Sequence, residues 1–331
     1  MRLVTFEKSG RRRVGALVDE RVVDLAAAHQ ARVRTGLLTA EDTMKTLPSD
    51  MCEFLAAGDA ALAAARRAIQ FATAGSGDRR LLFPLKSVRL CAPVPRPNKV
   101  FALAGNYRAH IAESSSKVKP WELVTPRVFM KPPSATIRGP GDEIRVPRNG
   151  NKIDWEAELA VVIGRQARLV LAEQAMQYVA GYTCFNDVSE RALKIWERTE
   201  EQTQEWDKFF DWLNGKWCDS FAPTGPVLVT REEVPDPHAL RITLDVNGQR
   251  MQDASTADMI FRVERLVEYI SAICTLEPGD LIATGTPSGV GMARGIFLKP
   301  GDTVRVSIEQ VGILENPVSA ELPDAATESS P

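Results

Sequence analysis

Beyond a proline-rich boundary at residues 92–97, the chain consists of short apolar runs separated by glycine and proline, and this pattern limits the fold more than any other feature. Short apolar runs bounded by turn residues are typical of β-strands. The runs lie at 99–104, 127–130, 156–163, 227–229, 281–283 and 303–308. We therefore expect a larger, mostly β domain in this part of the chain.

Two local patterns add detail to this domain. Residues 241–246 and 249–252 flank Asn247-Gly248, a pair that favours the type I′ turn of a β-hairpin. Residues 264–274 have the apolar spacing of an amphipathic helix.

The N-terminal part has a different texture. Residues 3–7 and 13–18 alternate around Ser9-Gly10 and predict a hairpin. Residues 26–33 and 49–74 have helical spacing, and the second run is rich in alanine, with Ser49 or Asp50 as its expected N-cap. We predict a small α/β domain at 1–95, the larger domain at 96–320 and a disordered tail at 321–331.

Charge and cysteine usage exclude several classes of protein. The 41 basic and 43 acidic side chains nearly cancel, and no apolar run approaches the ~18 residues of a membrane span. We therefore expect neither nucleic acid nor a membrane as partner. Arginines at 11–13 stand where a signal peptide would need its apolar core, and five widely spaced cysteines fit a reducing compartment. These features favour a cytoplasmic location.

Histidine is the scarcest relevant residue. Only three are present (His29, His110 and His238), so a multi-histidine metal site is nearly excluded, and any metal is expected to be a hard cation bound by oxygens. The sequence also lacks the nucleophile elbow, the Walker loop, the zincin helix motif and the dinucleotide-binding glycine motif.

The strongest chemical pattern is the acidic alternation Asp154, Glu156, Glu158 at the start of an apolar run. In a strand these three residues share one face, and carboxylates two positions apart can converge on one ion. A solvated face of an edge strand is the alternative explanation.

Further polar residues follow other predicted strands. Asp187 ends the strand-like run 181–187 and could supply a third oxygen ligand, while Lys216 could offset the carboxylates. If residues 105–113 are helical, Glu113 can orient the ring of His110, as a general base requires, although such a pair is more often a surface pair. The glycine-rich turn 284–291 could hold a carboxylate on its N–H groups, or be only a turn.

Residues 189–214 form an unusual acidic and aromatic stretch. It carries seven acids, four bases and three of the six tryptophans, Trp196, Trp206 and Trp212, with Phe209 and Phe210. A helix with this aromatic load must bury one face. It either packs on its own domain or on a second subunit, or it forms a cap that walls a substrate pocket.

Taken in order, these motifs resemble the fumarylacetoacetate hydrolase family over about residues 99–318. The resemblance implies an α+β, predominantly β fold, with a mixed β-roll catalytic domain at 96–320 behind the small α/β domain. It also implies a homodimer and a Mg²⁺ or Mn²⁺ ion held by Glu156, Glu158 and Asp187.

The same resemblance assigns the remaining roles. His110 and Glu113 would activate water from a segment that becomes ordered over bound substrate, and Lys216 would be the active-site lysine. Positions that line the family's substrate pocket correspond to Lys131, Gln252 and Thr286. Asp154 is adjacent to the ligands without being one, and is expected to support them or to lie at the surface.

The expected substrate is a small 2-keto acid, and the expected reaction is hydrolysis of a C–C bond in a 2,4-diketo acid such as an acylpyruvate or fumarylpyruvate. The ion would stabilise the resulting enolate. Such a hydrolase would act in the breakdown of aromatic compounds. Isomerisation of a 2-hydroxy-dienedioate or decarboxylation of oxaloacetate at the same site is the alternative. The non-enzymatic alternative is a metal-binding scaffold or interaction protein.

Overall fold

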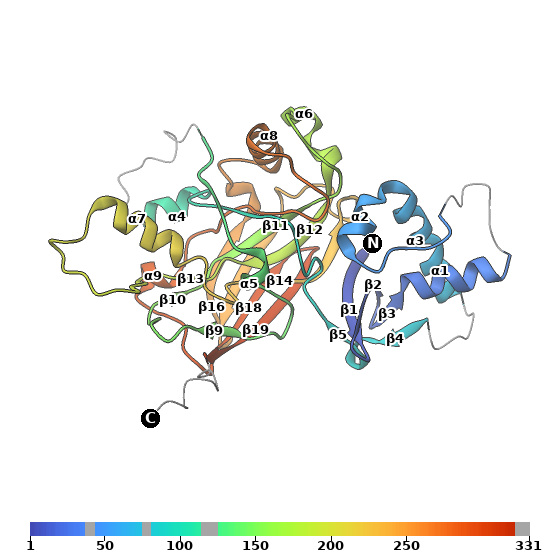
Figure 1. The fold of residues 1–331 in the computed structure, drawn as a ribbon, viewed down its shortest axis with the longest axis horizontal. Coiled ribbons are helices and arrows are strands. Elements are labelled where there is room, and N and C mark those ends of the chain that lie inside the picture. Colours follow the sequence, from blue (N-terminus) through green and yellow to red (C-terminus); the bar gives the residue numbers. More distant parts are fainter. Residues whose placement is uncertain (37–43, 75–80, 114–124, 322–331) are drawn as a thin grey trace, which may run out of the picture.

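The structure, a computed structural model, describes residues 1–36, 44–74, 81–113 and 125–321 (Figure 1). The predicted disordered tail, apart from Glu321, lies outside the described residues. The fold is mixed and rich in strands, as expected from the sequence: within the described residues the strands form one large sheet, one five-stranded sheet and one short pair.

The large sheet runs through both predicted domains. Its neighbouring strands follow the order β4-β3-β2-β1-β14-β12-β11-β17-β6-β7, with β5 also on β1 and β8 also on β14. The strands are β1 (Arg2–Lys8), β2 (Arg11–Val18), β3 (Arg21–Asp24), β4 (Leu82–Pro84), β5 (Arg89–Leu90), β6 (Val100–Leu103), β7 (Val128–Met130), β8 (Ile137–Arg138), β11 (Ala157–Ile163), β12 (Val179–Asn186), β14 (Ala222–Thr230) and β17 (Leu281–Ala283). Because β1 pairs antiparallel with β14, the N-terminal region and the larger region share hydrogen bonds of one sheet.

The remaining strands form two smaller sheets. The five-stranded sheet has the order β16-β15-β18-β19-β9, and β10 pairs with β13. These strands are β9 (Ile144–Val146), β10 (Ile153–Asp154), β13 (Ser189–Glu190), β15 (Arg241–Val246), β16 (Gln249–Ser255), β18 (Thr303–Ile308) and β19 (Gly312–Ala320). The predicted hairpin between β15 and β16 is confirmed, and Asn247 and Gly248 both have positive φ, as a type I′ turn requires.

Helices lie outside the sheets and at the ends of strands (Figure 1). They are α1 (Leu25–Arg34), α2 (Met51–Ala56), α3 (Gly58–Thr73), α4 (Arg108–Glu113), α5 (Pro133–Thr136), α6 (Ala172–Ala175), α7 (Glu205–Asn214), α8 (Val263–Ile273) and α9 (Gly291–Arg294). Among the described residues, no helix combines the length and the apolar character that crossing a membrane requires.

One prediction for the N-terminal part is wrong in detail. The run 49–74 forms two helices: α2 ends at Ala56, and α3 begins at Gly58, whose φ of +62 interrupts the helical backbone. Asp50 is the N-cap of α2, and its side chain accepts the N–H groups of Cys52 and Glu53. The hairpin at Ser9-Gly10 is confirmed as β1 and β2.

Strand β11 lies in the middle of the core and is buried on both faces. Leu159 and Val161 belong to a cluster shared with the five-stranded sheet, whereas Ala160 and Val162 belong to a second cluster with the alanines of α3. All seven residues of β11 are buried. A polar side chain at the start of this strand is therefore fixed by a rigid and closely packed support.

Candidate metal centre and active site

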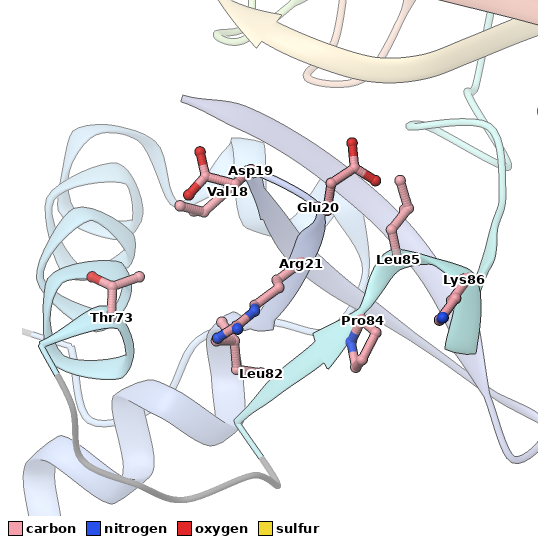
Figure 2. Close-up of a pocket in the computed structure, with 9 residues that line it drawn as sticks. All are labelled: Val18, Asp19, Glu20, Arg21, Thr73, Leu82, Pro84, Leu85 and Lys86. Carbon is pink, nitrogen blue, oxygen red and sulfur yellow. The ribbon is translucent and has the colours of Figure 1, made fainter.

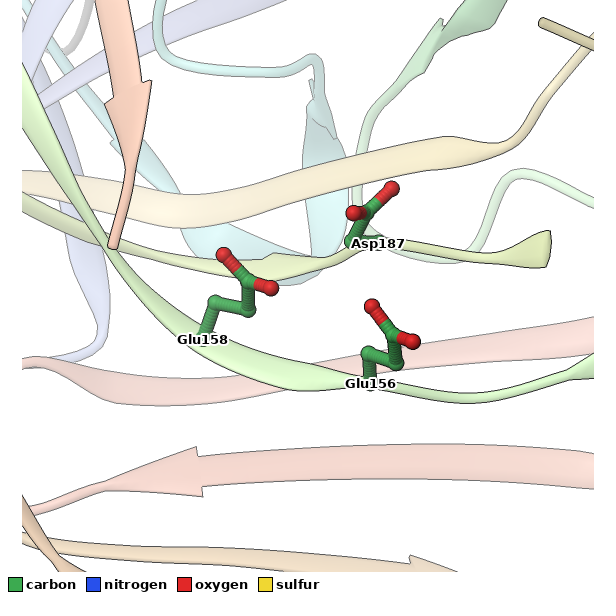
Figure 3. A group of neighbouring side chains, drawn as sticks. All are labelled: Glu156, Glu158 and Asp187. Carbon is green, nitrogen blue, oxygen red and sulfur yellow. The ribbon is translucent and has the colours of Figure 1, made fainter. Parts of the chain in front are cut away.

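Three carboxylates from two neighbouring strands meet at one point. Glu156 and Glu158 stand on either side of Ala157, the first residue of β11, and Asp187 directly follows Asn186, the last residue of β12. Ala157 pairs with Asn186, so the three acidic residues surround this pair. One oxygen from each of the three side chains lies within 4.8 Å of the other two, and all three residues are buried (Figure 3). The prediction that these side chains meet is confirmed, and the edge-strand alternative is wrong.

Two buried lysines hold Asp187. Lys216 Nζ donates to Asp187 Oδ2 at 2.8 Å and to Glu156 Oε2 at 2.6 Å. Lys131 Nζ donates to Asp187 Oδ1 and, at 3.0 Å, to the carbonyl oxygen of Val188. Lys216 thus lies beside the carboxylates, as expected. Lys131 is fully buried against Asp187, and its predicted contact with substrate stays a prediction.

The two ammonium groups have opposite pKa shifts. Burial lowers the pKa of Lys131, and the charge of Lys216 lowers it further, although Asp187 opposes both effects. Burial would also lower the pKa of Lys216, but the charges of Asp187 and Glu156 outweigh it and raise that pKa. Lys216 is therefore the more firmly protonated of the two.

Asp154 is not at the surface. It is fully buried, and its carboxylate accepts Arg191 Nε at 2.8 Å and the N–H groups of Gly291 at 2.5 Å and Met292 at 3.1 Å. Arg191 also donates to Glu156 through Nη2. The contacts of Asp154 fit the expected supporting role, because Asp154 holds the guanidinium of Arg191, which in turn bonds Glu156.

The two glutamates of the cluster have opposite pKa shifts. Burial would raise the pKa of Glu156, but the charges of Lys216 and Arg191 outweigh it and lower that pKa to about 2. Burial raises the pKa of Glu158 well above its ordinary value, and the charges of Asp187 and Glu156 raise it further.

The oxygen atoms of Glu158 indicate what the cluster can bind. Oε2 accepts the N–H of Gly285 at 2.7 Å, whereas Oε1 is buried and has no hydrogen-bond partner among the described residues. An unsatisfied buried carboxylate oxygen is costly, and a cation would satisfy it. Three clustered carboxylates are also the hard oxygen donors that Mg²⁺ and Mn²⁺ prefer. The donor set therefore fits a divalent ion.

The glycine-rich segment after β17 contributes N–H groups to the site. Gly285 N donates to Glu158, and Gly289 N donates to Glu113 Oε2 at 2.8 Å. The prediction that this turn holds a carboxylate is confirmed for these two contacts. Gly285 has φ +92, and a Cβ there would lie 2.7 Å from Asn106 Cβ, so only glycine fits without a shift.

The predicted His–Glu pair is present at α4. His110 Nδ1 lies 3.0 Å from Glu113 Oε1. Asn106, two residues before α4, fixes its position: Nδ2 donates to the carbonyl oxygens of Thr284 at 2.7 Å and Phe261 at 3.0 Å, and Oδ1 accepts the N–H of Phe261 at 2.8 Å. This asparagine was not singled out from the sequence.

Glu113 is held in its charged form. Burial would raise the pKa of Glu113, but hydrogen bonds from His110 and from the N–H of Gly289 outweigh it and lower that pKa. A carboxylate beside Nδ1 favours the tautomer with the proton on Nδ1, which leaves Nε2 free to accept a proton. When His110 is protonated, its charge lowers the pKa of Glu156, so the His–Glu pair lies within electrostatic range of the carboxylates.

A cavity of about 820 Å³ lies over this part of the molecule. Its polar wall includes His110, Glu113, Arg127 and Arg191. Its apolar wall consists of Ile111, Val128, Phe129, Phe209, Trp212, Val290 and Met292 together with small residues. Arg191, which bonds Glu156, connects this cavity to the carboxylate cluster.

Another hollow, of about 770 Å³, lies in the N-terminal region (Figure 2). It is formed by the β2–β3 turn, β4 and the end of α3, and its charged residues are Asp19, Glu20, Arg21 and Lys86. It contains none of the clustered carboxylates and no histidine. We therefore assign the candidate active site to the cavity beside α4.

The other two predicted pocket residues connect the loop to the core. Gln252 Oε1 accepts the N–H of Ala157 at 2.9 Å, and Nε2 donates to Thr286 Oγ1 at 2.9 Å and to the carbonyl oxygen of Pro287 at 2.8 Å. Gln252 and Thr286 are both buried. They fix the glycine-rich segment against β11, and their contact with substrate stays a prediction.

The aromatic stretch 189–214 begins with β13 and ends with α7. Phe209 and Trp212 of α7 line the cavity, in agreement with the cap interpretation. No residue of α7 is fully buried, but residues 211–214 are half-buried and the Trp212 ring meets Phe129 of β7, so the helix packs in part on its own domain. Trp196 and Trp206 are 82% and 71% exposed. Packing of this surface on a second subunit stays a prediction.

Sequence comparisons agree with this geometry. The sequence model described as "Fumarylacetoacetate (FAA) hydrolase C-terminal" matches residues 99–319. The chain is 40% identical over 310 residues to "Oxaloacetate tautomerase FAHD2B, mitochondrial" from Bos taurus, a match that covers 91% of this chain and 92% of that protein.

Two solved structures of enzymes with different named activities are similar to this chain. Maleylpyruvate hydrolase from Sphingobium sp. SYK-6, in complex with manganese(II) ion and pyruvate, matches with a TM-score of 0.71 and 30% identity over 97% of this chain and 100% of that chain. The 2-hydroxyhepta-2,4-diene-1,7-dioate isomerase from Mycobacterium marinum matches with a TM-score of 0.67 and 31% identity over 98% of this chain and 100% of that chain.

Proposed function

The chain belongs to the fumarylacetoacetate hydrolase family of enzymes, and on that premise we propose that it interconverts the keto and enol forms of a small 2-keto acid, with oxaloacetate as the first candidate substrate. The observation that carries the proposal is the position of a buried carboxylate triad beside a cavity lined by a His–Glu pair. The oxaloacetate tautomerase among the relatives supports the choice of substrate.

Glu156, Glu158 and Asp187 would hold a divalent ion, Mg²⁺ or Mn²⁺. Such an ion, when bound, supplies a Lewis acid that stabilises negative charge on the 2-oxo oxygen. Four carboxylates, counting Asp154, face the side chains of Lys131, Lys216 and Arg191, so with a divalent ion bound and both lysines protonated the centre would be net positive. This charge favours an anionic substrate. The manganese ion and pyruvate in the Sphingobium enzyme support this assignment.

His110 would move the proton. Glu113 keeps the proton of His110 on Nδ1, so Nε2 can take a proton from C3 of the keto acid or return one to the enol. In the keto-to-enol direction the C3–H bond breaks and an O–H bond forms on the former 2-oxo oxygen. The reaction needs no attacking water and no second substrate. The apolar wall of the cavity limits the access of water to the reacting atoms.

Hydrolysis of a C–C bond in a 2,4-diketo acid is the second candidate reaction. Two observations favour it: the His–Glu pair that would activate water is intact, and maleylpyruvate hydrolase is similar in structure. In this reaction His110 would take its proton from water instead of from C3.

The proposal is tested by adding enol-oxaloacetate to the manganese-loaded protein and following the loss of enol absorbance. We expect rapid ketonisation that depends on added metal and falls by ~10²–10⁴-fold in His110→Ala, while metal affinity is retained. Acetylpyruvate, followed by loss of diketo absorbance, tests the second candidate in parallel. Release of CO₂ from oxaloacetate would instead indicate decarboxylation. Absence of enol loss above the uncatalysed rate would refute tautomerisation.

A further inference from the structure

A continuous row of aromatic rings leads from the carboxylate cluster to the outer wall of the cavity. The first ring is that of Phe129, whose centre lies 5.5 Å from the ammonium of Lys216. The same ammonium bonds two of the clustered carboxylates. The Phe129 ring meets Trp212 edge-on at 5.2 Å, and Trp212 lies 5.8 Å from Phe209. The row therefore has one end at the ion site and the other on α7.

The rings of this row are wall residues of the same cavity. Phe129 comes from β7 in the large sheet, whereas Trp212 and Phe209 come from α7, and all three line the space that also contains His110 and Glu113. Trp212 and Phe209 are not buried, so their ring surfaces remain accessible from the cavity. Aromatic surface is thus available to the part of a substrate that would point away from the ion site.

This wall does not match the chemistry of oxaloacetate. Oxaloacetate has two carboxylates separated by only two carbons and no apolar group larger than a methylene, and its few heavy atoms fill a small part of a cavity of about 820 Å³. A carboxylate gains nothing from contact with the face of an aromatic ring, whereas an aromatic ring gains both area burial and edge-to-face contacts. Of the two arginines that line the cavity, Arg191 is already bonded to Asp154 and Glu156, and Arg127, which could bind a distal carboxylate, lies at an exposed position of the same wall.

Building on the proposed function, we infer that Trp212 and Phe209 form a binding site for an aromatic ring at the distal end of the substrate, so that the enzyme also tautomerises aryl-substituted 2-keto acids. The reaction at C3 is the same: a C3–H bond breaks, an O–H bond forms on the 2-oxo oxygen, and no oxidant or second substrate is required. Phe129 would separate the distal ring from Lys216.

Phenylpyruvate is a suitable probe, because it combines a 2-keto acid with a single distal ring. The test compares kcat/KM for tautomerisation of phenylpyruvate and of oxaloacetate in the manganese-loaded protein, and measures phenylpyruvate binding by calorimetry. For Trp212→Ala we expect the ratio of phenylpyruvate to oxaloacetate kcat/KM to fall at least ~10-fold and the Kd for phenylpyruvate to rise by a similar factor. Trp212→Phe should retain most of both.

Trp196→Ala is the matched control, because Trp196 belongs to the same stretch, is 82% exposed and does not line the cavity. It should leave the ratio and the Kd unchanged. Phe209→Ala provides a second variant if Trp212→Ala does not give a folded protein, and a several-fold fall in the ratio is expected. If wild type accepts oxaloacetate but not phenylpyruvate, or if Trp212→Ala lowers neither quantity, the inference is wrong. If oxaloacetate itself is not tautomerised, the proposed function fails instead.

Discussion

At the scale of single residues, Glu158 shows the clearest conflict between position and charge. It is fully buried at the start of a packed strand, and its Oε1 atom has no hydrogen-bond partner among the described residues. Burial and the neighbouring charges of Asp187 and Glu156 raise its pKa well above the ordinary 4.5, so in the metal-free protein Glu158 stays neutral to higher pH than an exposed glutamate does. Coordination of a cation needs the carboxylate form, so metal binding is coupled to loss of a proton.

This coupling predicts the pH dependence of metal binding. As pH rises from about 4.5 through the raised pKa of Glu158, the metal-free protein loses the stability that the neutral carboxyl contributes, because the folded pKa exceeds the unfolded one. Metal affinity should rise over the same range, with proton release on binding. Calorimetry with Mn²⁺ in buffers of different ionisation enthalpy measures this release. An affinity independent of pH above 4.5, with no proton released, would contradict the prediction.

A second prediction concerns Glu113, which acts through His110. Glu113→Gln removes the charge that holds the proton on Nδ1, so we expect turnover to fall by ~10²-fold or more. Manganese affinity should change little, since Glu113 is not one of the clustered carboxylates. Glu264→Gln is a matched control, because Glu264 lies 3.7 Å from His238, in a pair that does not line the cavity. Equal turnover in the two variants would exclude the orienting role of Glu113.

At the scale of structural elements, the segment after β17 connects the two halves of the site. Its N–H groups hold Glu158 and Glu113, and Gln252 fixes it to the start of β11. The contribution comes from backbone groups and from the absence of a side chain at Gly285. A sequence pattern can therefore indicate a turn here, but not which carboxylates it holds.

Gly285→Ala tests this element. The new methyl group would lie 2.7 Å from Asn106 Cβ at a φ of +92, so either the loop or the segment before α4 must move. We expect a loss of about 1–3 kcal/mol in the free energy of unfolding and a large loss of turnover. Chemical denaturation and the enol assay measure the two effects. Gly301→Ala is the control, because Gly301 also has a positive φ (+96) but has open space where a Cβ would lie, so it adds backbone strain without a clash. An equal loss of turnover in Gly285→Ala and Gly301→Ala would show that the clash is unimportant.

Features that depend on residues close together in the sequence could be predicted, whereas contacts between distant residues could not. The turns at Ser9-Gly10 and Asn247-Gly248 and the pair His110/Glu113 depend on neighbouring residues, so they could be predicted. The break at Gly58 is local too, but alanine-rich flanks concealed it. Arg191 and Asn106 have no local signal, because their partners are distant in the chain: Arg191 bonds Asp154, and Asn106 bonds Phe261.

At the scale of the whole molecule, the N-terminal region is part of the same sheet as the site. Strand β1 pairs with β14, and Val4 and Phe6 belong to the core cluster that contains Leu159 and Val161 of β11. The sequence predicts a boundary near residue 95 from its prolines and change of texture, and that division into domains stays a prediction. The shared sheet is a long-range pairing that the texture of a sequence does not encode.

This continuity predicts that the larger region does not fold alone. A fragment that starts at residue 96 would expose the edge of β14 and leave the core without Val4 and Phe6. We expect aggregation, or a fragment with no cooperative thermal transition by circular dichroism. Co-expression with residues 1–95 as a separate chain should restore a soluble complex. A soluble fragment with a sharp transition would show that the shared strands are dispensable.

The proposed reaction requires that Glu156, Glu158 and Asp187 are ligands of one divalent ion. Anomalous diffraction from crystals of the manganese-loaded protein tests this directly. We predict a single strong peak per chain within coordination distance, about 2–2.3 Å, of oxygens from all three side chains. A peak bound elsewhere, or no peak at saturating manganese, would contradict the assignment and, with it, the proposed enzymology.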